Sequence, residues 1–314
     1  MTQRLENFCR LLEEKELEAI LVGQAENRRY LSGFTGSSGV LLISKDRALL
    51  ATDSRYYEQA RRQAPDYELV KVTASMRAAL AAQVAELGLN RLGFEGHVVT
   101  VEMFEGWKQA MPQVEWVATS GLVEGLRQVK EAGEIEAIEE AVRIADDAMG
   151  HIMGWIRPGM TEREVSWELE THMRTHGAER LSFTTIVASG PNGAMAHAEA
   201  SERRIEIGDP IVIDMGAVYE GYCSDMTRSF CLVEASDEYR AVWNIVLEAQ
   251  LAAEKAIKAG MSGVEADAVA RQIICDAEYG AKFGHGLGHG LGLAIHEAPR
   301  VARTSKETLR LGAG

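Results

Sequence analysis

The sequence has 314 residues, with 47 acidic and 33 basic side chains that give a formal net charge of -14 at neutral pH. Because nucleic acids and anionic membranes bind proteins through clustered Lys and Arg side chains, this charge excludes both as expected partners. Hydrophobic residues make up 46% of the chain and charged residues 25%, which is typical of a globular protein and excludes a disordered or fibrous class.

The length is sufficient for two domains, each with a hydrophobic core of its own. The first residues, Met-Thr-Gln-Arg-Leu-Glu, lack the apolar core of a secretion signal, and no apolar run approaches the roughly 18 residues of a membrane span. We therefore expect a cytoplasmic protein. The four cysteines have no Cys-x-x-Cys spacing, which argues against a disulfide framework or a structural zinc site.

Residues 1–124 alternate helical and strand patterns, which predicts an α/β domain. The predicted helices cover residues 5–16, 56–63, 76–87 and 101–111, and the predicted strands cover residues 19–22, 40–44, 48–52, 69–72, 91–94 and 114–118. The glycine-containing stretch 27–39 could be taken for a loop that binds phosphate. Its glycines match neither G-x-x-x-x-G-K-[ST] nor G-x-G-x-x-G, so it is not predicted to bind phosphate.

A charged, glycine-bearing stretch near residues 121–133 predicts a domain boundary close to residue 125, so that the second domain covers residues 125–314. Apolar residues then recur at steps of three and four and predict an amphipathic helix that ends at Arg157-Pro158-Gly159. These apolar residues are Ile135, Ile138, Val142, Ala145, Met149, Ile152 and Ile156. Thr161 and Glu164 have the spacing of a capping box, which predicts a second helix through His172.

A short internal repeat links two parts of this second domain. Residues 159–165, Gly-Met-Thr-Glu-Arg-Glu-Val, are echoed by residues 260–266, Gly-Met-Ser-Gly-Val-Glu-Ala. Both stretches follow a long helical pattern and open a second helix with a capping box. The repeat predicts a duplicated helix-helix-strand unit with a pseudo-twofold axis, and a functional site between its halves.

Residues 211–217 and 223–232 are rich in β-forming residues and predict an antiparallel hairpin, in which Gly221 adopts a positive φ angle. The hairpin is expected to bring Asp214 and Asp225 almost opposite one another, about 5 Å apart at Cβ. Two carboxylates at that separation repel unless one is protonated or a cation lies between them, so the pair predicts a metal site. His289 is a candidate third ligand, and an imidazole favours manganese, cobalt, zinc or iron over calcium.

Four of the eight histidines lie near this hairpin or in the glycine-rich loop 284–292, namely His197, His285, His289 and His296. Glycines around His285 and His289 let the backbone approach a ligand closely, which ordinary packing does not require. The loop has no G-x-G-x-x-G register, so a dinucleotide is not predicted there. The other four, His97, His151, His172 and His176, are interpreted as isolated surface or core residues.

Residues 27–39, 211–230 and 284–299, taken together, resemble the Xaa-Pro aminopeptidase and prolidase branch of the pita-bread metallopeptidases. The resemblance extends in order over essentially the whole chain. It implies a creatinase-like N-terminal α/β domain over residues 1–124 and a pita-bread α+β domain over residues 125–314. It also implies hydrolysis of peptides with proline at the second position, two divalent metal ions with manganese preferred to cobalt or zinc, and a homodimer.

The same resemblance implies roles for individual residues. Asp214 and Asp225 bind metal, with Asp225 bridging both ions, and His289 binds one of them. His197, His285 and His296 line the substrate pocket, and His197 and His296 help to stabilise the tetrahedral intermediate. These roles agree with general chemistry, because metal ions polarise a carbonyl group and imidazoles donate hydrogen bonds to a developing oxyanion.

One departure from the family pattern concerns the C-terminal end. The family supplies two further metal-binding glutamates, in a Glu-Pro-Gly strand and an Arg-x-Glu-Asp strand, after a Leu-x-x-Gly turn. That turn corresponds here to residues 309–312, and the sequence ends at Gly314. Glu297 and Glu307 do not have the matching context. We therefore expect a pita-bread domain that lacks its last strands, as in a truncated product of an active peptidase.

Several alternatives share part of the pattern. A Xaa-Pro dipeptidase, or prolidase, has the same motifs, and no residue named above distinguishes it from the preferred aminopeptidase. A creatinase relative would use no metal, which Asp214, Asp225 and His289 argue against. A methionine aminopeptidase would share only the second domain. A catalytically silent binding protein is the alternative from outside the enzymes.

Overall fold

The computed structural model describes residues 3–305 and 307–309. The chain divides into two compact units, Met1–Arg127 and Gln128–Gly314, each of which is described here by itself. Part of the turn expected at residues 309–312, and everything after it, lies outside the described residues. No helix in the described part of the chain has the length and apolar character needed to span a lipid bilayer.

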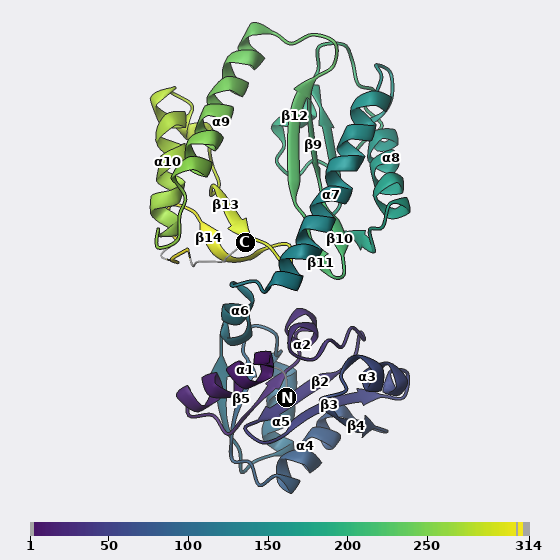
Figure 1. The fold of residues 1–314 in the computed structure, drawn as a ribbon, viewed down its shortest axis with the longest axis vertical. Coiled ribbons are helices and arrows are strands. Elements are labelled where there is room, and N and C mark those ends of the chain that lie inside the picture. Colours follow the sequence, from purple (N-terminus) through teal and green to yellow (C-terminus); the bar gives the residue numbers. More distant parts are fainter. Residues whose placement is uncertain (1–2, 306, 310–314) are drawn as a thin grey trace. The chain divides into compact units, whose positions relative to one another are not determined.

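The first unit is built on a mixed six-stranded sheet with the strand order β4-β3-β2-β1-β5-β6. Its strands are β1 (Ala19–Val22), β2 (Val40–Ser44), β3 (Ala48–Asp53), β4 (Glu68–Val72), β5 (Arg91–Glu95) and β6 (Glu115–Thr119). The pairs β1–β2 and β2–β3 are antiparallel, and the other three pairs are parallel. Helices lie on both sides of the sheet (Figure 1), which is why every residue of β1 is apolar and buried.

Six helices accompany this sheet, namely α1 (Gln3–Glu14), α2 (Ala25–Ser32), α3 (Tyr57–Gln63), α4 (Met76–Glu86), α5 (Val101–Ala110) and α6 (Leu122–Arg127). All six predicted strands and all four predicted helices are confirmed, with ends that agree within two residues. The sequence predicted no helix at residues 25–32, where α2 lies. The buried Arg28 guanidinium donates to the carbonyls of Gly23, Gly36 and Gly39, so this polar segment is held by tertiary hydrogen bonds rather than by an apolar stripe.

The second unit contains two pairs of long helices and several short strands. The helices are α7 (Ala132–Trp155), α8 (Glu162–Thr175), α9 (Asp237–Ala256) and α10 (Gly263–Asp276). The strands are β7 (Arg180–Leu181), β8 (Ile186–Ser189), β9 (Pro210–Met215), β10 (Ala217–Tyr219), β11 (Tyr222–Cys223), β12 (Met226–Cys231), β13 (Gly288–Gly290) and β14 (Glu297–Val301), in the sheets β11-β10-β7, β12-β9-β8 and β13-β14. Within this unit α7 and α8 lie on one side of β9 and β12, and α9 and α10 lie on the other (Figure 1).

The buried face of α7 differs from the predicted stripe. Ile135 and Val142 are each 40% exposed, whereas Ala137, Ala141 and Ala148 are buried. α7 packs against β10 and β11, and its buried face combines these alanines with Ile144 and Ile152 and leaves Ile135 and Val142 outside it. The helix itself was predicted correctly, but its packing face was predicted correctly only in part.

The two predicted capping boxes are both present. The Thr161 side chain and the Glu164 side chain cap α8, and Ser262 and Glu265 cap α10 in the same reciprocal manner. Each box follows a glycine with a positive φ angle, 90° at Gly159 and 92° at Gly260. These matching turns confirm that the short sequence repeat marks equivalent structural positions.

The two repeated stretches are also alike in the short segment that pairs with each capping residue. The amide of Gly159 donates to the carbonyl of Ile205 over 2.8 Å, and the amide of Gly260 donates to the carbonyl of Leu309 over 2.8 Å. Isolated antiparallel bridges then join Thr161 to Arg204 and Ser262 to Thr308. The second unit therefore contains two copies of one helix-turn-helix arrangement, closed in each case by a returning extended segment.

Candidate functional site

The acidic hairpin is formed by β9 to β12 and turns at Glu220 and Gly221. Both turn residues have positive φ angles, 45° and 79°, as a two-residue hairpin turn of type I′ requires. The positive φ predicted for Gly221 is confirmed. This turn fixes the register of the whole hairpin, because Tyr219 pairs with Tyr222 next to it and the strands pair antiparallel from there.

The register places Asp214 opposite Thr227, so the expectation that Asp214 almost faces Asp225 is wrong. Asp225 precedes Thr227 by two residues, which makes it the diagonal neighbour of Asp214 on the same face of the hairpin. The cause is the tight turn, which adds no residue between the strands beyond Glu220 and Gly221. Thr227 Oγ1 instead donates a hydrogen bond of 2.8 Å to Asp214 Oδ1.

The Asp214 carboxylate is partly buried, and burial raises its pKa above the usual value for an aspartate. The hydrogen bond from Thr227 lowers the pKa, and the negative charge of Asp225 raises it again. The net shift is upward. The hydrogen bond from Thr227 therefore does not fully offset the cost of burying the negative charge of Asp214. A bound cation would offset the rest of that cost.

His289, in β13, presents one particular ring nitrogen toward this hairpin. Its Nδ1 lies 2.9 Å from the carbonyl oxygen of Gly290. Because a carbonyl only accepts, Nδ1 carries the proton and Nε2 keeps its lone pair. Nε2 lies 3.5 Å from Asp225 Oδ2, so the ligand atoms of these two residues converge. The His296 ring lies beside His289, with 4.3 Å between the ring centroids.

A cavity of about 780 Å³ collects most of the residues that the sequence predicts for the site. Asp214 and the four histidines His197, His285, His289 and His296 all line it. Asp225 does not line it but contacts His289 from the hairpin side. The site lies where the two copies of the duplicated unit meet, since the aspartates and His197 belong to the first copy and the other histidines belong to the second.

Two further cavity residues were missed by the sequence analysis. Thr227 lines the cavity and holds Asp214, and Arg300 contributes a guanidinium group from β14. Arg300 pairs with His289 across β13 and β14, so the register of this ribbon fixes their proximity. Glu297 and Glu307 have other partners, because Glu297 accepts a hydrogen bond from the Ala294 amide and Glu307 accepts one from the Arg300 amide.

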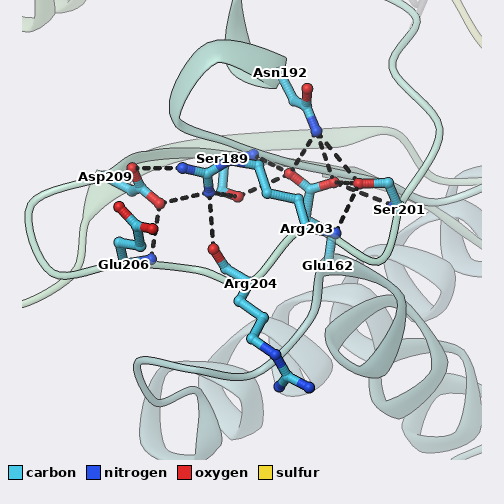
Figure 2. Close-up of polar contacts among 8 residues, drawn as sticks. All are labelled: Glu162, Ser189, Asn192, Ser201, Arg203, Arg204, Glu206 and Asp209. Carbon is cyan, nitrogen blue, oxygen red and sulfur yellow. Dashed lines mark hydrogen bonds and ion pairs between the residues drawn. The ribbon is translucent and has the colours of Figure 1, made fainter.

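Glu162 anchors the loop that carries His197. This residue is fully buried in the first turn of α8, and its carboxylate accepts hydrogen bonds from the backbone amides and hydroxyls of Ser189 and Ser201 and from the Asn192 side chain (Figure 2). Burial would raise the Glu162 pKa, but these donors outweigh it and the pKa lies below its usual value. The network joins both ends of the segment between Ser189 and Ser201, within which His197 lies.

A second ion pair anchors the loop that carries His285. Asp267 and Arg271, one turn apart on α10, form a bidentate pair of 2.6 and 2.8 Å, and Asp267 is buried. The remaining donors of Arg271 bind the carbonyls of Phe283 and His285, and Asp267 accepts from the Leu287 amide. Neither anchor has a recognisable sequence motif, because each acts on residues at least a dozen positions away.

Comparison with known proteins gives two family matches that together cover nearly all of the chain. Residues 136–314 match the model of metallopeptidase family M24, and residues 4–129 match the model of the creatinase/prolidase N-terminal domain. A curated relative, the uncharacterized peptidase YqhT of Bacillus subtilis, is 40% identical over 309 residues, which cover 98% of this chain and 88% of that protein.

Solved structures agree with these matches. The Xaa-Pro dipeptidase from Bacillus anthracis superposes with a TM-score of 0.95 and 47% sequence identity, over 98% of this chain and 86% of that one. The X-Pro aminopeptidase from Thermotoga maritima superposes with a TM-score of 0.87 and 40% identity, over 95% and 86% of the two chains. The similarity therefore covers both units, and the two structures carry different activity names.

Proposed function

Because the chain belongs to metallopeptidase family M24 and carries a creatinase/prolidase N-terminal domain, we propose that it cleaves the Xaa-Pro bond at the N-terminus of peptides. Members of the family are hydrolases that use divalent metal ions, and the fold is that of the prolidases, with a creatinase-type domain before a pita-bread domain. The observation that carries the proposal is the convergence of Asp214, Asp225 and His289 beside a cavity lined by three further histidines.

The donor set fits a divalent metal. Burial raises the pKa of the Asp214 carboxylate. The Asp225 carboxylate and the imidazole lone pair of His289 lie close to one another. Carboxylate and imidazole ligands suit manganese, cobalt or zinc better than calcium. Asp214, Asp225 and His289 are the residues that would hold divalent metal in this chain, for which two ions and a preference for manganese are expected.

When bound, the metal supplies a Lewis acid for the scissile carbonyl and lowers the pKa of a water molecule. The protein residues supply orientation and hydrogen bonds. Thr227 holds the Asp214 carboxylate, and the Gly290 carbonyl holds the His289 tautomer. His197 and His296 face the same cavity, where imidazole N–H groups donate to the negative charge that develops on the substrate carbonyl oxygen. His285 is assigned to substrate binding.

A direct assay tests this function. Purified protein is supplied with Mn²⁺ or Co²⁺ and given a Xaa-Pro dipeptide, a Xaa-Pro-Xaa tripeptide and a matched tripeptide with alanine in place of proline. We expect metal-dependent release of the first residue from the proline peptides only, provided that the protein assayed also supplies the two metal-binding glutamates of the family pattern. Replacing either His197 or His296 with Ala should lower kcat by about 10²–10³-fold while metal content is unchanged. Metal loading without any cleavage before proline would contradict the proposal.

A second candidate is a Xaa-Pro dipeptidase, and one observation favours it. Arg300 places a guanidinium group at the cavity directly across β13 and β14 from His289. A guanidinium pairs well with a free carboxylate, which a dipeptide substrate would bring close to the metal and a longer peptide would not. Replacing Arg300 with Met should raise KM for the dipeptide more than for the tripeptide if dipeptides are the preferred substrate. Equal changes in both would favour the aminopeptidase.

The family resemblance implies the oligomeric state, and the N-terminal residues predict the location. A homodimer and a cytoplasmic location stay predictions. Gel filtration with light scattering measures the first, and fractionation of cells that express the protein measures the second.

A further inference from the structure

Three histidines that the sequence predicts to be isolated residues form one column on the surface of the second unit. The His172 ring is stacked between the rings of His151 and His176, with centroid distances of 4.4 and 3.9 Å and interplanar angles of 18° and 14°. Carboxylates flank the column, since His172 Nε2 lies 2.8 Å from Asp147 Oδ2 and His151 Nε2 lies 2.7 Å from Glu168 Oε1. The interpretation of these histidines as unrelated is wrong.

We propose that Asp147, His172 and His176 form a second metal site, separate from the catalytic one, which binds a divalent transition-metal ion such as zinc between α7 and α8. One ligand atom from each of these three residues lies within 4.8 Å of the other two. Asp147 belongs to α7, and His172 and His176 lie four residues apart at the C-terminal end of α8. None of the three is among the residues that line the catalytic cavity in the described structure.

The hydrogen bond of His176 leaves one ligand atom available, whereas the proton between His172 Nε2 and Asp147 must leave, and one of the two stacked rings must rotate, before both lone pairs point at one ion. His176 Nδ1 lies 2.8 Å from the carbonyl oxygen of His172, which only accepts, so Nδ1 carries the proton and Nε2 keeps its lone pair. A backbone carbonyl bound to the second ring nitrogen is the usual partner of a metal-binding histidine. The Asp147 side chain is 49% exposed and the His172 side chain 14% exposed, so an ion reaches the cluster from solvent.

The separation between Asp147 and His172 also suits an ion. A tetrahedral zinc site with bonds of about 2.1 Å separates its ligand atoms by about 3.4 Å. The 2.8 Å hydrogen bond therefore needs to open by only a few tenths of an ångström when an ion replaces its proton. Two imidazole nitrogens and one carboxylate oxygen select zinc, cobalt, nickel or copper over calcium and magnesium.

The position of His172 and His176 at the end of α8 also favours cation binding. Unpaired carbonyl groups give the C-terminal end of α8 a partial negative charge, which attracts a cation. Asp147 adds a negative charge from the adjacent helix. An ion held here connects α7 to α8 on the surface of the first copy of the duplicated unit, so its expected effect is on stability and not on catalysis.

The test separates this site from the catalytic site by removing the catalytic ligands. Zn²⁺ is titrated by calorimetry into the full chain that carries Asp214→Asn and Asp225→Asn. We expect one equivalent to bind, and the further change His176→Gln to weaken that binding at least about tenfold. The matched control is His151→Gln, which removes a stacked ring but no proposed ligand and should leave the affinity unchanged. No binding to the double variant, or equal binding with His176→Gln, would overturn the proposal.

Two more measurements guard against misfolding and against failure of the proposed peptidase function. The metal-free melting temperature of the His176→Gln protein is measured first, because His176 stacks on His172 and its Nδ1–H donates to the His172 carbonyl, and the effect of Zn²⁺ is taken as the shift from that value. Added Zn²⁺ should raise the melting temperature of the double variant but not that of its His176→Gln derivative. These experiments measure only metal binding and stability. Their result therefore does not depend on whether the protein cleaves Xaa-Pro peptides.

Discussion

The Asp214 carboxylate, which we propose as a metal ligand, destabilises the metal-free fold. Its pKa is higher in the folded protein than in the unfolded chain, so its ionisation destabilises the fold as pH rises through the folded-state pKa. We therefore expect Asp214→Asn to increase the free energy of unfolding at pH 7 in the presence of a chelator. The difference should disappear below about pH 4, where the unfolded-state aspartate is also protonated.

Urea denaturation of the wild-type and Asp214→Asn proteins at both pH values measures this effect. Saturating Mn²⁺ is the internal control, because only the wild type gains stability from a metal that Asp214 helps to bind. A chelated Asp214→Asn protein that is less stable than the wild type at pH 7 would show that the Thr227 hydrogen bond outweighs burial.

Thr227 is expected to control metal affinity through Asp214. Its hydroxyl donates to Asp214 Oδ1, and partners that orient a metal-binding side chain typically contribute 10- to 100-fold in affinity or activity, so we expect Thr227→Val to weaken Mn²⁺ binding by about that factor. Thr227→Ser keeps the hydroxyl and should bind Mn²⁺ as the wild type does. Calorimetric titration measures both, and equal affinities for the Val and Ser proteins would contradict this role.

Residue types and the local glycine pattern were enough to single out the acidic and imidazole residues that the structure brings together at the cavity. Asp214, Asp225 and His289 stand out in the sequence because carboxylates in a hairpin and a histidine among glycines are unusual in ordinary packing. Thr227 and Arg300 do not stand out, since a threonine and an arginine in strands are common. Their roles depend on strand register, which the two-residue turn and the β13–β14 pairing decide.

At the scale of the elements, Glu162 links α8 to the His197 loop. Glu162→Ala would leave the buried donors of Ser189 and Ser201 without their acceptor, which we expect to lower the free energy of unfolding by at least about 3 kcal/mol. Glu162→Gln keeps one acceptor oxygen and should cost less. Urea denaturation at pH 7 measures both, and an alanine variant as stable as the wild type would contradict this role.

The same carboxylate gives a pH signature with a defined sign. Because its folded-state pKa is lowered, Glu162 contributes stability above its unfolded-state pKa of about 4.3, and this contribution is lost as pH falls through the lower folded-state value. The stability difference between wild type and Glu162→Gln should therefore narrow below about pH 4.3. A difference that is independent of pH would mean that shape, and not charge, holds the loop.

The Asp267–Arg271 pair provides the matching prediction for the second loop. Arg271→Lys keeps the positive charge but loses the fork that binds the carbonyls of Phe283 and His285. Since His285 is assigned to substrate binding, we expect KM for a Xaa-Pro substrate to rise about tenfold, with a smaller change in kcat. Steady-state kinetics separates the two constants, and a fall in kcat alone would contradict the assignment.

Sequence periodicity located the helices and strands better than it located their contacts. It predicted α7 but not the alanines on its buried face, because periodicity reports which residues are apolar and not how near the neighbouring elements lie. It missed α2 because the burial of Asn27 and Arg28 there depends on partners such as Glu95 and Gly39, which are distant in the sequence.

At the scale of the whole molecule, the first unit has a hydrophobic core of its own, so we expect it to fold by itself. Its sheet carries a core of its own, which includes stacked and edge-to-face contacts among Phe94, Phe104, Trp107 and Trp116. We expect residues 1–127 made alone to unfold cooperatively, with a change in the fluorescence of these two tryptophans. Thermal melts followed by fluorescence measure this, and a broad, non-cooperative change would contradict it.

The architecture at this scale was predicted from motif order and not from composition. Length and charge excluded classes of protein, but they are shared by many unrelated globular enzymes. The separated motifs in residues 27–39, 211–230 and 284–299 identified the family that the comparisons then gave. The internal repeat predicted the two copies of the second unit, because a glycine turn and a capping box are local features that sequence records directly.

The meeting of the two copies at the cavity has a mechanical consequence. Asp214 and Asp225 come from one copy and His289 from the other. An ion bound by all three would therefore link the two copies across the interface between them. At a hundredfold excess over its dissociation constant, such an ion adds about 2.7 kcal/mol against opening. Removing the ion with a chelator should therefore let the two copies separate more often. Faster exchange of backbone amide hydrogens in both copies would report this opening.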